Sequence, residues 1–319
     1  MHSPQNFEHD ASPPGRVGTT VTNYRGWRDS YLLSNGLVEA VVVPLIGRIM
    51  QFRLCGEQYS VLWTNDALEG RMADPKSSEW MNFGGDKAWP APQSDWDKVT
   101  PRAWPPPAGF DAIPFEAKVD QGTVILTSAI DPDYGIQVVR RIRLKPSRPA
   151  MAVATEYHKV KGAPIRLAVW VITQVHDPER IFVLLPERSS FDTRFKRLME
   201  PTPRDLKIEG KLLSLTRDPE QCTKIGTVGS RVLWLGRDHA LCIENTDAPG
   251  EYPDGGSKTE VYTNSDPMRY VEIETMGPLA TLNVGDRVEQ ANTYTLVPRV
   301  LPDETAEAER VFGVGVSEP

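Results

Sequence analysis

Two glutamates on one short segment are the residues of this sequence best spaced to do chemistry together. The segment RYVEIET at 269–275 alternates polar and apolar residues, which is typical of a half-buried strand. On such a strand Tyr270, Glu272 and Glu274 share one face, with the two carboxylates about 7 Å apart. Because paired like charges raise the pKa of one carboxyl, one glutamate could act as a general base while the other holds a hydroxyl. The alternative is a solvated strand face without chemistry.

A histidine ends a second strand-like segment, IRLAVWVITQVH at 165–176. Its alternation predicts one apolar face and one face that carries Trp170, Gln174 and His176. An imidazole exchanges protons near neutral pH, which makes His176 the candidate general acid. A surface histidine at a strand end is the alternative.

The glycine- and tryptophan-rich segment MNFGGDKAWPAPQSDW at 81–96 is expected to border this site. Its paired glycines permit close backbone approach, Asp86 and Lys87 offer polar contacts, and Trp89 offers a stacking surface. The segment belongs to a longer stretch with little periodicity, at about 64–115, that is rich in tryptophan and proline. So long an irregular stretch that keeps its tryptophans out of water is usually functional.

Short strand-like stretches separated by turn signals fill most of the remaining chain. The stretch YLLSNGLVEAVVV predicts a hairpin with its turn at Asn35-Gly36. The 28 prolines oppose long helices, and the one expected helix lies in DETAEAERVFGVG at 303–315. A dozen or more strands predict an all-β sandwich or barrel. We expect a flexible lead-in at 1–20 and then a single domain at 21–319, which carries the 64–115 insertion.

Composition excludes several classes of function. The net charge of −7, without a run of basic residues, disfavours nucleic acids and anionic membranes as partners. Three cysteines without CxxC spacing disfavour a disulfide framework or a structural zinc site and suggest free thiols in the cytoplasm. No secretory signal or membrane-spanning run is recognised. Nucleotide-binding and nucleophile-elbow motifs are absent too, so neither a cofactor nor a metal is expected.

Together these segments resemble the galactose mutarotase-like superfamily, and within it the DUF4380 branch. The resemblance covers about residues 20–300 and implies a β-supersandwich, in which large antiparallel sheets form a concave carbohydrate-binding face. The expected partner is then a small sugar or sugar derivative, and the expected assembly is a monomer or homodimer. The stretches that carry the resemblance are VVVPLIGRIMQFRLCGEQYSVLW, NFGGDKAWPAPQ, LAVWVITQV and EVYTNSDPMRYVEIETMGPLATLNVGD.

The resemblance also implies roles for two residues. An Ile-Glu-Thr step followed by proline resembles the strand with the general-base glutamate of aldose 1-epimerases, which gives Glu274 that role and makes Glu272 an additional carboxylate. Mutarotases carry an acid histidine in a motif similar to H-x-Y-F-N, where this chain reads WVITQVHDPERIF. His176 lies near that position, and Trp170 and Gln174 are the alternatives for it.

The leading hypothesis is therefore an aldose 1-epimerase-like enzyme, with Glu274 as base at the anomeric hydroxyl and His176 as acid at the ring oxygen. Arg48 and Lys87 would suit an acidic or phosphorylated sugar, or else form structural ion pairs. The alternatives are a non-catalytic carbohydrate-binding protein, or lyase or hydrolase chemistry on the same scaffold. The expected sugar contacts are Arg48, Asp86, Lys87, Trp89, Trp170, Gln174, Glu260 and Glu272.

Overall fold

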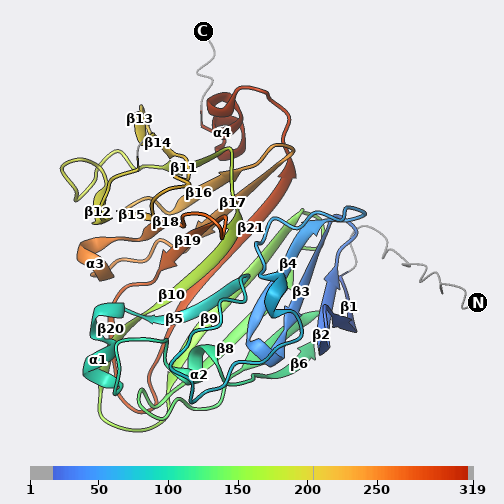
Figure 1. Ribbon diagram of the computed structural model, residues 1–319, viewed down its shortest axis with the longest axis vertical. Coiled ribbons are helices and arrows are strands. Elements are labelled where there is room, and N and C mark those ends of the chain that lie inside the picture. Colours follow the sequence, from blue (N-terminus) through green and yellow to red (C-terminus); the bar gives the residue numbers. More distant parts are fainter. Residues whose placement is uncertain (1–16, 204, 315–319) are drawn as a thin grey trace, which may run out of the picture.

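Two large antiparallel sheets make up most of the computed structural model, which describes residues 17–203 and 205–314 (Figure 1). The predicted all-β class is confirmed, and the described helices are short. Among them, the helix expected near the end of the chain is α4. The α-helices are α1 (Trp96–Val99), α2 (Ala108–Asp111), α3 (Pro253–Gly256) and α4 (Glu304–Phe312).

The strands of each sheet come from distant parts of the sequence. The larger sheet runs in the order β1 (Gly18–Tyr24), β2 (Trp27–Ser34), β3 (Val38–Val43), β4 (Arg48–Leu54), β5 (Asp86–Ala91), β10 (Ile165–His176), β19 (Tyr270–Met276), β18 (Thr259–Thr263), β15 (Thr223–Thr227), β12 (Lys196–Met199), with β20 (Ala280–Leu282) beside β10. The smaller sheet runs in the order β13 (Lys207–Glu209), β14 (Leu212–Leu215), β11 (Arg180–Leu184), β16 (Arg231–Leu235), β17 (His239–Asn245), β21 (Arg287–Pro298), β9 (Ala150–Lys159), β8 (Ile136–Leu144), β7 (Thr123–Thr127), β6 (Glu116–Asp120).

The predicted hairpin at Asn35-Gly36 joins β2 to β3 and is confirmed. The Asn35 side chain accepts hydrogen bonds from the backbone N–H groups of Leu37 at 2.9 Å and Val38 at 2.8 Å, which closes the turn. Its amide donates to the carbonyls of Lys145 at 2.6 Å and Arg148 at 2.9 Å, in the turn between β8 and β9. The turn therefore also ties the larger sheet to the smaller one.

The stretch expected to be irregular contains a central strand, β5, between β4 and β10. A proline is tolerated there because β4 pairs with β5 only at Ile49 and Asp86, so Pro90 interrupts no ladder on that side. The preceding glycines do allow close approach, but to the protein's own backbone. A Cβ at Gly84 would lie 2.2 Å from the Trp63 carbonyl oxygen, and both glycines have positive φ.

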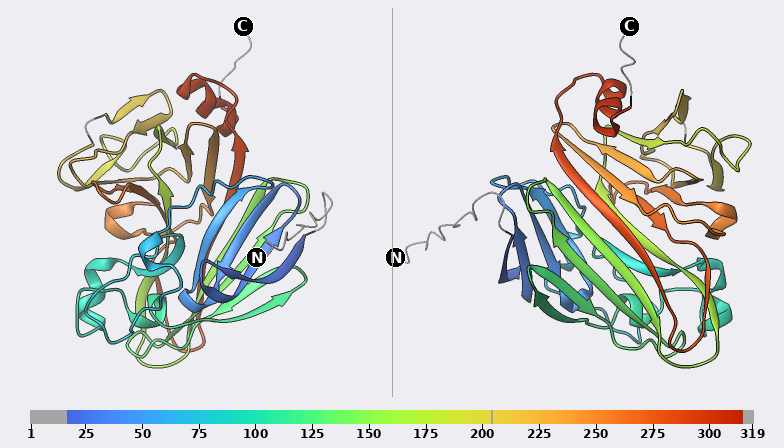
Figure 2. Two further views of the ribbon diagram at one scale, coloured as in Figure 1. Left: turned by 45° about the vertical axis from the view of Figure 1, so that its right-hand side comes forward. Right: turned by 180° about the vertical axis from the view of Figure 1, so that it is seen from behind.

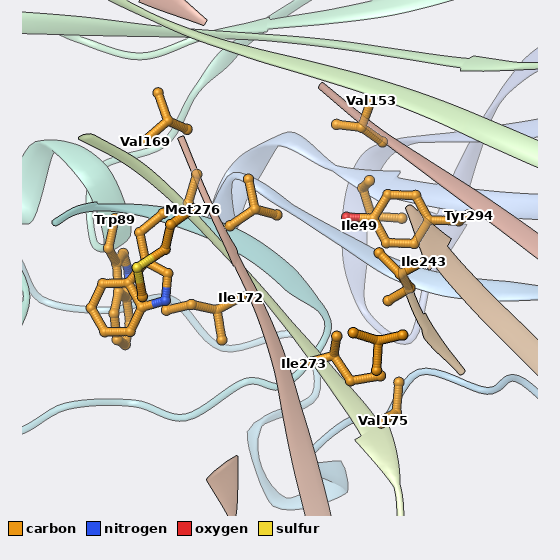
Figure 3. Packing of buried hydrophobic residues seen from close by; sticks show 14 of the residues in the cluster. Ile49, Trp89, Val153, Val169, Ile172, Val175, Ile243, Ile273, Met276 and Tyr294 are labelled. Carbon is orange, nitrogen blue, oxygen red and sulfur yellow. The ribbon is translucent and has the colours of Figure 1, made fainter. Parts of the chain in front are cut away.

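The core lies between the two sheets, where the apolar faces of β10 and β19 meet residues of the smaller sheet. The predicted alternation is confirmed, because Val271 and Ile273 are fully buried in this core. Figure 3 shows Ile273 on the side of Tyr294 and Ile243, whereas Ile172 lies on the side of Trp89. Successive residues of β10 and β19 therefore serve two different environments.

The C-terminal helix α4 covers a smaller apolar cluster at one end of the smaller sheet (Figure 2). Ala308 and Phe312 of α4 pack with Phe182 and Leu233 of β11 and β16. Within the described ranges, no helix has the length and apolar character needed to cross a membrane. Strand β1 begins at Gly18, and residues 1–16 of the expected lead-in lie outside the described residues.

Candidate functional site

Neighbouring strands of the larger sheet turn polar side chains to the face opposite the core. Strand register decides which of them meet: Glu274 on β19 lies opposite Glu260 on β18. Glu272 lies opposite Gln174 on β10. Directly paired residues of antiparallel strands project to the same side of a sheet. We call this set the polar face, and it consists of Lys87, Gln174, Lys224, Glu260, Tyr262, Glu272 and Glu274.

Glu274 is held firmly within the polar face. Its side chain is 1% exposed, and its Oε2 accepts hydrogen bonds from Trp170 Nε1 at 2.7 Å and Lys224 Nζ at 2.9 Å. Burial raises the pKa of the Glu274 carboxyl, and the Lys224 ammonium opposes that shift without cancelling it. The position and charge of this carboxyl are therefore set by neighbours from β10 and β15.

Lys224 is shared between two carboxylates. Its Nζ also lies 2.7 Å from Glu260 Oε2, and the Glu260 side chain is completely buried. Burial raises the pKa of Glu260 to about 8 against the attraction of Lys224, and the nearby Glu274 adds to the increase. Burial by itself would lower the pKa of Lys224, but the two carboxylates raise it above its usual value. The Lys224 ammonium is therefore charged at neutral pH.

Glu272 is the most accessible carboxylate of the polar face, with 13% of its side chain exposed. Its Oε1 lies 3.5 Å from Lys87 Nζ, and the Lys87 side chain is 1% exposed. Burial lowers the pKa of Lys87, and the Glu272 charge acts in the opposite direction. The ammonium also lies 4.8 Å from the centre of the Trp89 ring, close enough for a cation–π contact. Glu272 and Lys87 thus form a second charged pair beside Gln174.

The Gln174 side chain has unused hydrogen-bonding capacity. It is fully buried, and in the described part of the chain neither of its amide atoms makes a hydrogen bond of good geometry, although the Tyr270 hydroxyl lies close by. A buried polar group without a partner costs about 1–3 kcal/mol. An amide that both donates and accepts in this position suits a ligand that carries hydroxyl groups.

Asp111 joins the tryptophan-rich insertion to the larger sheet. Its Oδ1 accepts from Arg48 Nη2 at 2.6 Å and Trp89 Nε1 at 3.0 Å, and its Oδ2 accepts from Trp80 Nε1 at 2.8 Å. Arg48 also donates to the Gly84 carbonyl at 2.8 Å and is 1% exposed. The guanidinium is therefore committed to an internal ion pair and is not available to an acidic or phosphorylated sugar.

Tryptophans of the insertion and of β10 pack together at the edge of the polar face. Trp89 and Trp170 meet edge to face with their ring centres 5.6 Å apart, and they are 3% and 4% exposed. Trp104 stacks on Trp96 and is 42% exposed. The structure thus does not present Trp89 or Trp170 to a ligand, whereas Trp104 offers an open ring.

Asp86 lies on the opposite side of the sheet from the polar face. It is fully buried between the sheets, where it pairs with Arg140 and accepts from Thr173 Oγ1 at 2.8 Å and Tyr294 OH at 2.6 Å. Its side chain faces the core because neighbouring residues of a strand point to opposite faces, and Lys87 points to the polar face.

His176 is on the polar-face side of β10, opposite Tyr270, but at the end of the strand. Its Cα is about 14 Å from that of Glu274 and about 8 Å from that of Glu272, by strand rise and spacing. The imidazole packs against Tyr59, with ring centres 5.5 Å apart, and burial lowers its pKa. Tyr59 also stacks on His239, and these two rings line a cavity of about 500 Å³.

Sequence reasoning missed Lys224 and Asp111. Lys224 lies in a short strand, TKIGT, where apolar and polar residues alternate too briefly to stand out. The partners of Asp111 are separated from it by 22, 31 and 63 positions. In the residues that the structure describes, no three histidine, cysteine or acidic side chains are grouped as metal ligands.

The fold defines the class of this protein. Its two-sheet architecture matches a galactose mutarotase-like protein from Lactobacillus casei ATCC 334 with a TM-score of 0.55 and 10% sequence identity, over 84% of this chain and 100% of that one. A protein from Escherichia coli K12 that is provisionally assigned as an aldose 1-epimerase matches with a TM-score of 0.53 and 13% identity, over 88% and 100% of the chains. The chain therefore has the galactose mutarotase-like fold.

The family can be stated as well. The sequence profile described as "Domain of unknown function (DUF4380)" matches residues 29–297, so the chain belongs to this family. The expected DUF4380 branch is confirmed, and so is the expected galactose mutarotase-like fold. Among curated protein sequences, none gives a significant match.

Proposed function

We propose that this protein is an aldose 1-epimerase-like enzyme that interconverts the anomers of a small sugar on its polar face. One observation carries the proposal. On that face of a galactose mutarotase-like fold, the Glu272 and Glu274 carboxylates lie near the ammonium group of Lys87 and the side-chain amide of Gln174, which has no hydrogen-bond partner among the described residues. Mutarotation requires a base at the anomeric hydroxyl and an acid at the ring oxygen. A fold alone does not define an activity, so the proposal rests on these side chains.

The base is a carboxylate of β19. The family resemblance favours Glu274, whereas accessibility favours Glu272, whose side chain is 13% exposed and whose negative charge lies beside Lys87. We assign the base role to Glu272 because it is the more accessible carboxylate, whereas the Glu274 side chain is 1% exposed and its Oε2 already accepts hydrogen bonds from Trp170 and Lys224. Gln174, opposite Glu272, then binds a sugar hydroxyl.

The position of His176 does not suit the role of general acid opposite Glu274. Its Cα lies about 14 Å from Glu274, further than a single sugar ring reaches, and its ring is covered by Tyr59. From Glu272 the separation is about 8 Å, which a sugar could bridge. His176 therefore remains a candidate only with Glu272 as its partner.

Polarimetry tests the proposal directly. Freshly dissolved α-glucose, α-galactose and other pure anomers are mixed with the purified full chain, and the decay of optical rotation is compared with the uncatalysed decay. We expect acceleration with at least one sugar and its loss in Glu272→Gln. As a matched control, Glu187→Gln changes a glutamate that is 81% exposed and should leave the rate unchanged. Absence of acceleration across the panel would refute the proposed activity.

A second candidate is sugar binding without chemistry, and the burial of Glu274 and Glu260 favours it. In this case a sugar from the same panel raises the melting temperature of the protein but does not change the decay of optical rotation. Glu272→Gln would then lose the thermal shift, which separates the two functions with one set of variants.

A further inference from the structure

The facing glutamates of β18 and β19 form an unusual charged group. Glu260 and Glu274 are directly opposite each other in register, and their side chains are 0% and 1% exposed. Lys224 Nζ is 2.7 Å from the first carboxylate and 2.9 Å from the second. One ammonium is therefore the shared partner of two buried carboxylates.

Among the described residues, the other ammonium groups near this pair already have partners of their own. Glu272 on β19 and Asp254 on α3 add negative charge near the pair. Lys87 on β5 is matched with Glu272, and Lys196 on β12 donates to the backbone carbonyl of Asp254 at 3.0 Å. If both glutamates were ionised, a net negative charge would be buried next to other carboxylates, which is strongly unfavourable.

The Glu260 carboxyl has little to stabilise a negative charge. Both of its oxygens are buried without a hydrogen bond to the described residues, and only the Lys224 ammonium, 2.7 Å from Oε2, offsets a charge there. A proton on one of the two carboxyls removes the excess charge, as happens when two carboxylates share a site. Nearby, the unsatisfied amide of Gln174 independently indicates that this face is built to meet a ligand.

We propose that Glu260 and Glu274 share one proton at neutral pH, with Lys224 charged between them, and that this pair is the acid of the sugar reaction. The second part rests on the proposed function. Glu274 is the member that delivers the proton, because it lies two residues from Glu272 on the same strand face. Lys224 and Glu260 act through Glu274 and are positioning residues.

With these roles, every proton that is transferred in the reaction has a donor and an acceptor. Glu272 takes the proton of the anomeric hydroxyl as the bond between C1 and the ring oxygen breaks, and the pair gives its proton to the ring oxygen. The anomeric oxygen becomes the carbonyl of the open-chain aldehyde. After rotation about the C1–C2 bond the ring closes on the other face of C1, the ring oxygen returns its proton to the pair, and Glu272 returns its proton to the anomeric oxygen. No oxidation occurs and no group is transferred.

Infrared difference spectroscopy of the full chain tests the shared proton without any substrate. At pH 7 the wild type should show the C=O stretch of a buried protonated carboxyl, and this band should disappear as the pH is raised towards 10. In Glu260→Gln and in Glu274→Gln the remaining carboxylate has Lys224 to itself and ionises, so the band should be lost at pH 7. Glu187→Gln serves as the exposed control. No band in the wild type at pH 7 would overturn the proposal, and the wild-type titration decides this even where a variant fails to fold.

The acid role is tested separately by the pH profile of mutarotation. In Glu260→Gln the alkaline limb should move to lower pH, and the rate at pH 7 should fall by about tenfold or more. An unchanged alkaline limb would refute the acid role. If the band is present but no sugar reacts, the enzyme function fails and the shared proton stands.

Discussion

The two faces of the larger sheet differ in how completely their buried polar groups are hydrogen-bonded. On the core side, both Asp86 carboxylate oxygens have partners, from Arg140 on one side and from Thr173 and Tyr294 on the other. On the polar face, Glu260 and Gln174 keep buried atoms without hydrogen-bond partners in the described chain. The two groups lie on opposite sides of the same sheet.

We infer from this difference that the buried groups on the core side stabilise the fold and that those on the polar face serve ligand binding. A satisfied buried network fixes how the two sheets pack, because any lost partner leaves an uncompensated charge. Unsatisfied buried groups weaken the fold, and in our proposal those of the polar face are completed by a ligand. Substitutions on one face at a time test whether the core side and the polar face have these different roles.

The largest effect on stability is expected from the core side. Asp86→Ala leaves the Arg140 guanidinium buried without its carboxylate and should lower the free energy of unfolding by about 3–5 kcal/mol. Urea denaturation measures this loss. Asp66→Ala removes an exposed ion pair with Arg25 and should cost less than about 1 kcal/mol. Equal losses in the two variants would contradict the structural role of Asp86.

Activity should respond to the polar face instead. Glu274→Gln should lower the mutarotation rate by about 10²–10⁴-fold, the usual contribution of one acid or base, while unfolding in urea remains cooperative. His176→Gln should lower it by less than about tenfold, because in our proposal the proton comes from Glu260 and Glu274 and not from the histidine. Polarimetry at a saturating sugar concentration compares them. A larger loss in the histidine variant would restore His176 as the acid.

The polar face should also make stability depend on pH. The pKa of Glu260 is raised from 4.5 to about 8 in the folded protein, so its protonated form favours folding at low pH. This stabilisation is complete below pH 4.5 and is lost as the pH rises through about 8. Glu260→Gln should therefore gain stability relative to the wild type from pH 5 to pH 9, by up to about 1.4 kcal/mol for each unit of pKa shift removed. Urea denaturation at both pH values measures the gain, and a constant difference would contradict the raised pKa.

The smallest effect is expected at Gln174, where one substitution distinguishes a role in sugar binding from a role in stability. Gln174→Met replaces an unsatisfied buried amide by an apolar side chain of similar size and should stabilise the fold by about 1 kcal/mol. The same change should abolish the thermal shift caused by a sugar. Val175→Ala, at the next position on the core side, should instead destabilise the fold and leave the shift intact. A destabilised Gln174→Met would show that the amide is satisfied in the free protein.

Much of the fold could be predicted from local patterns. The period of two in 165–176 and 269–275 correctly predicts which residues of β10 and β19 share a face, because alternation is a property of a single strand. The Asn35-Gly36 hairpin and helix α4 follow from equally local signals. Strand β5 is masked in the sequence by the two glycines before it and by Pro90 within it, and without this strand Asp86 and Lys87 could not be assigned to opposite faces.

Local patterns in the sequence suffice for the all-β class, the mutarotase-like resemblance and the shared face of Glu272 and Glu274. The tertiary structure sets what surrounds these two glutamates. It placed Lys224 against Glu274 from 50 positions away and Tyr294 against Asp86 from 208 positions away. Contacts between distant strands depend on their order and register in the sheet, and these are set by packing of the whole chain rather than by any local spacing.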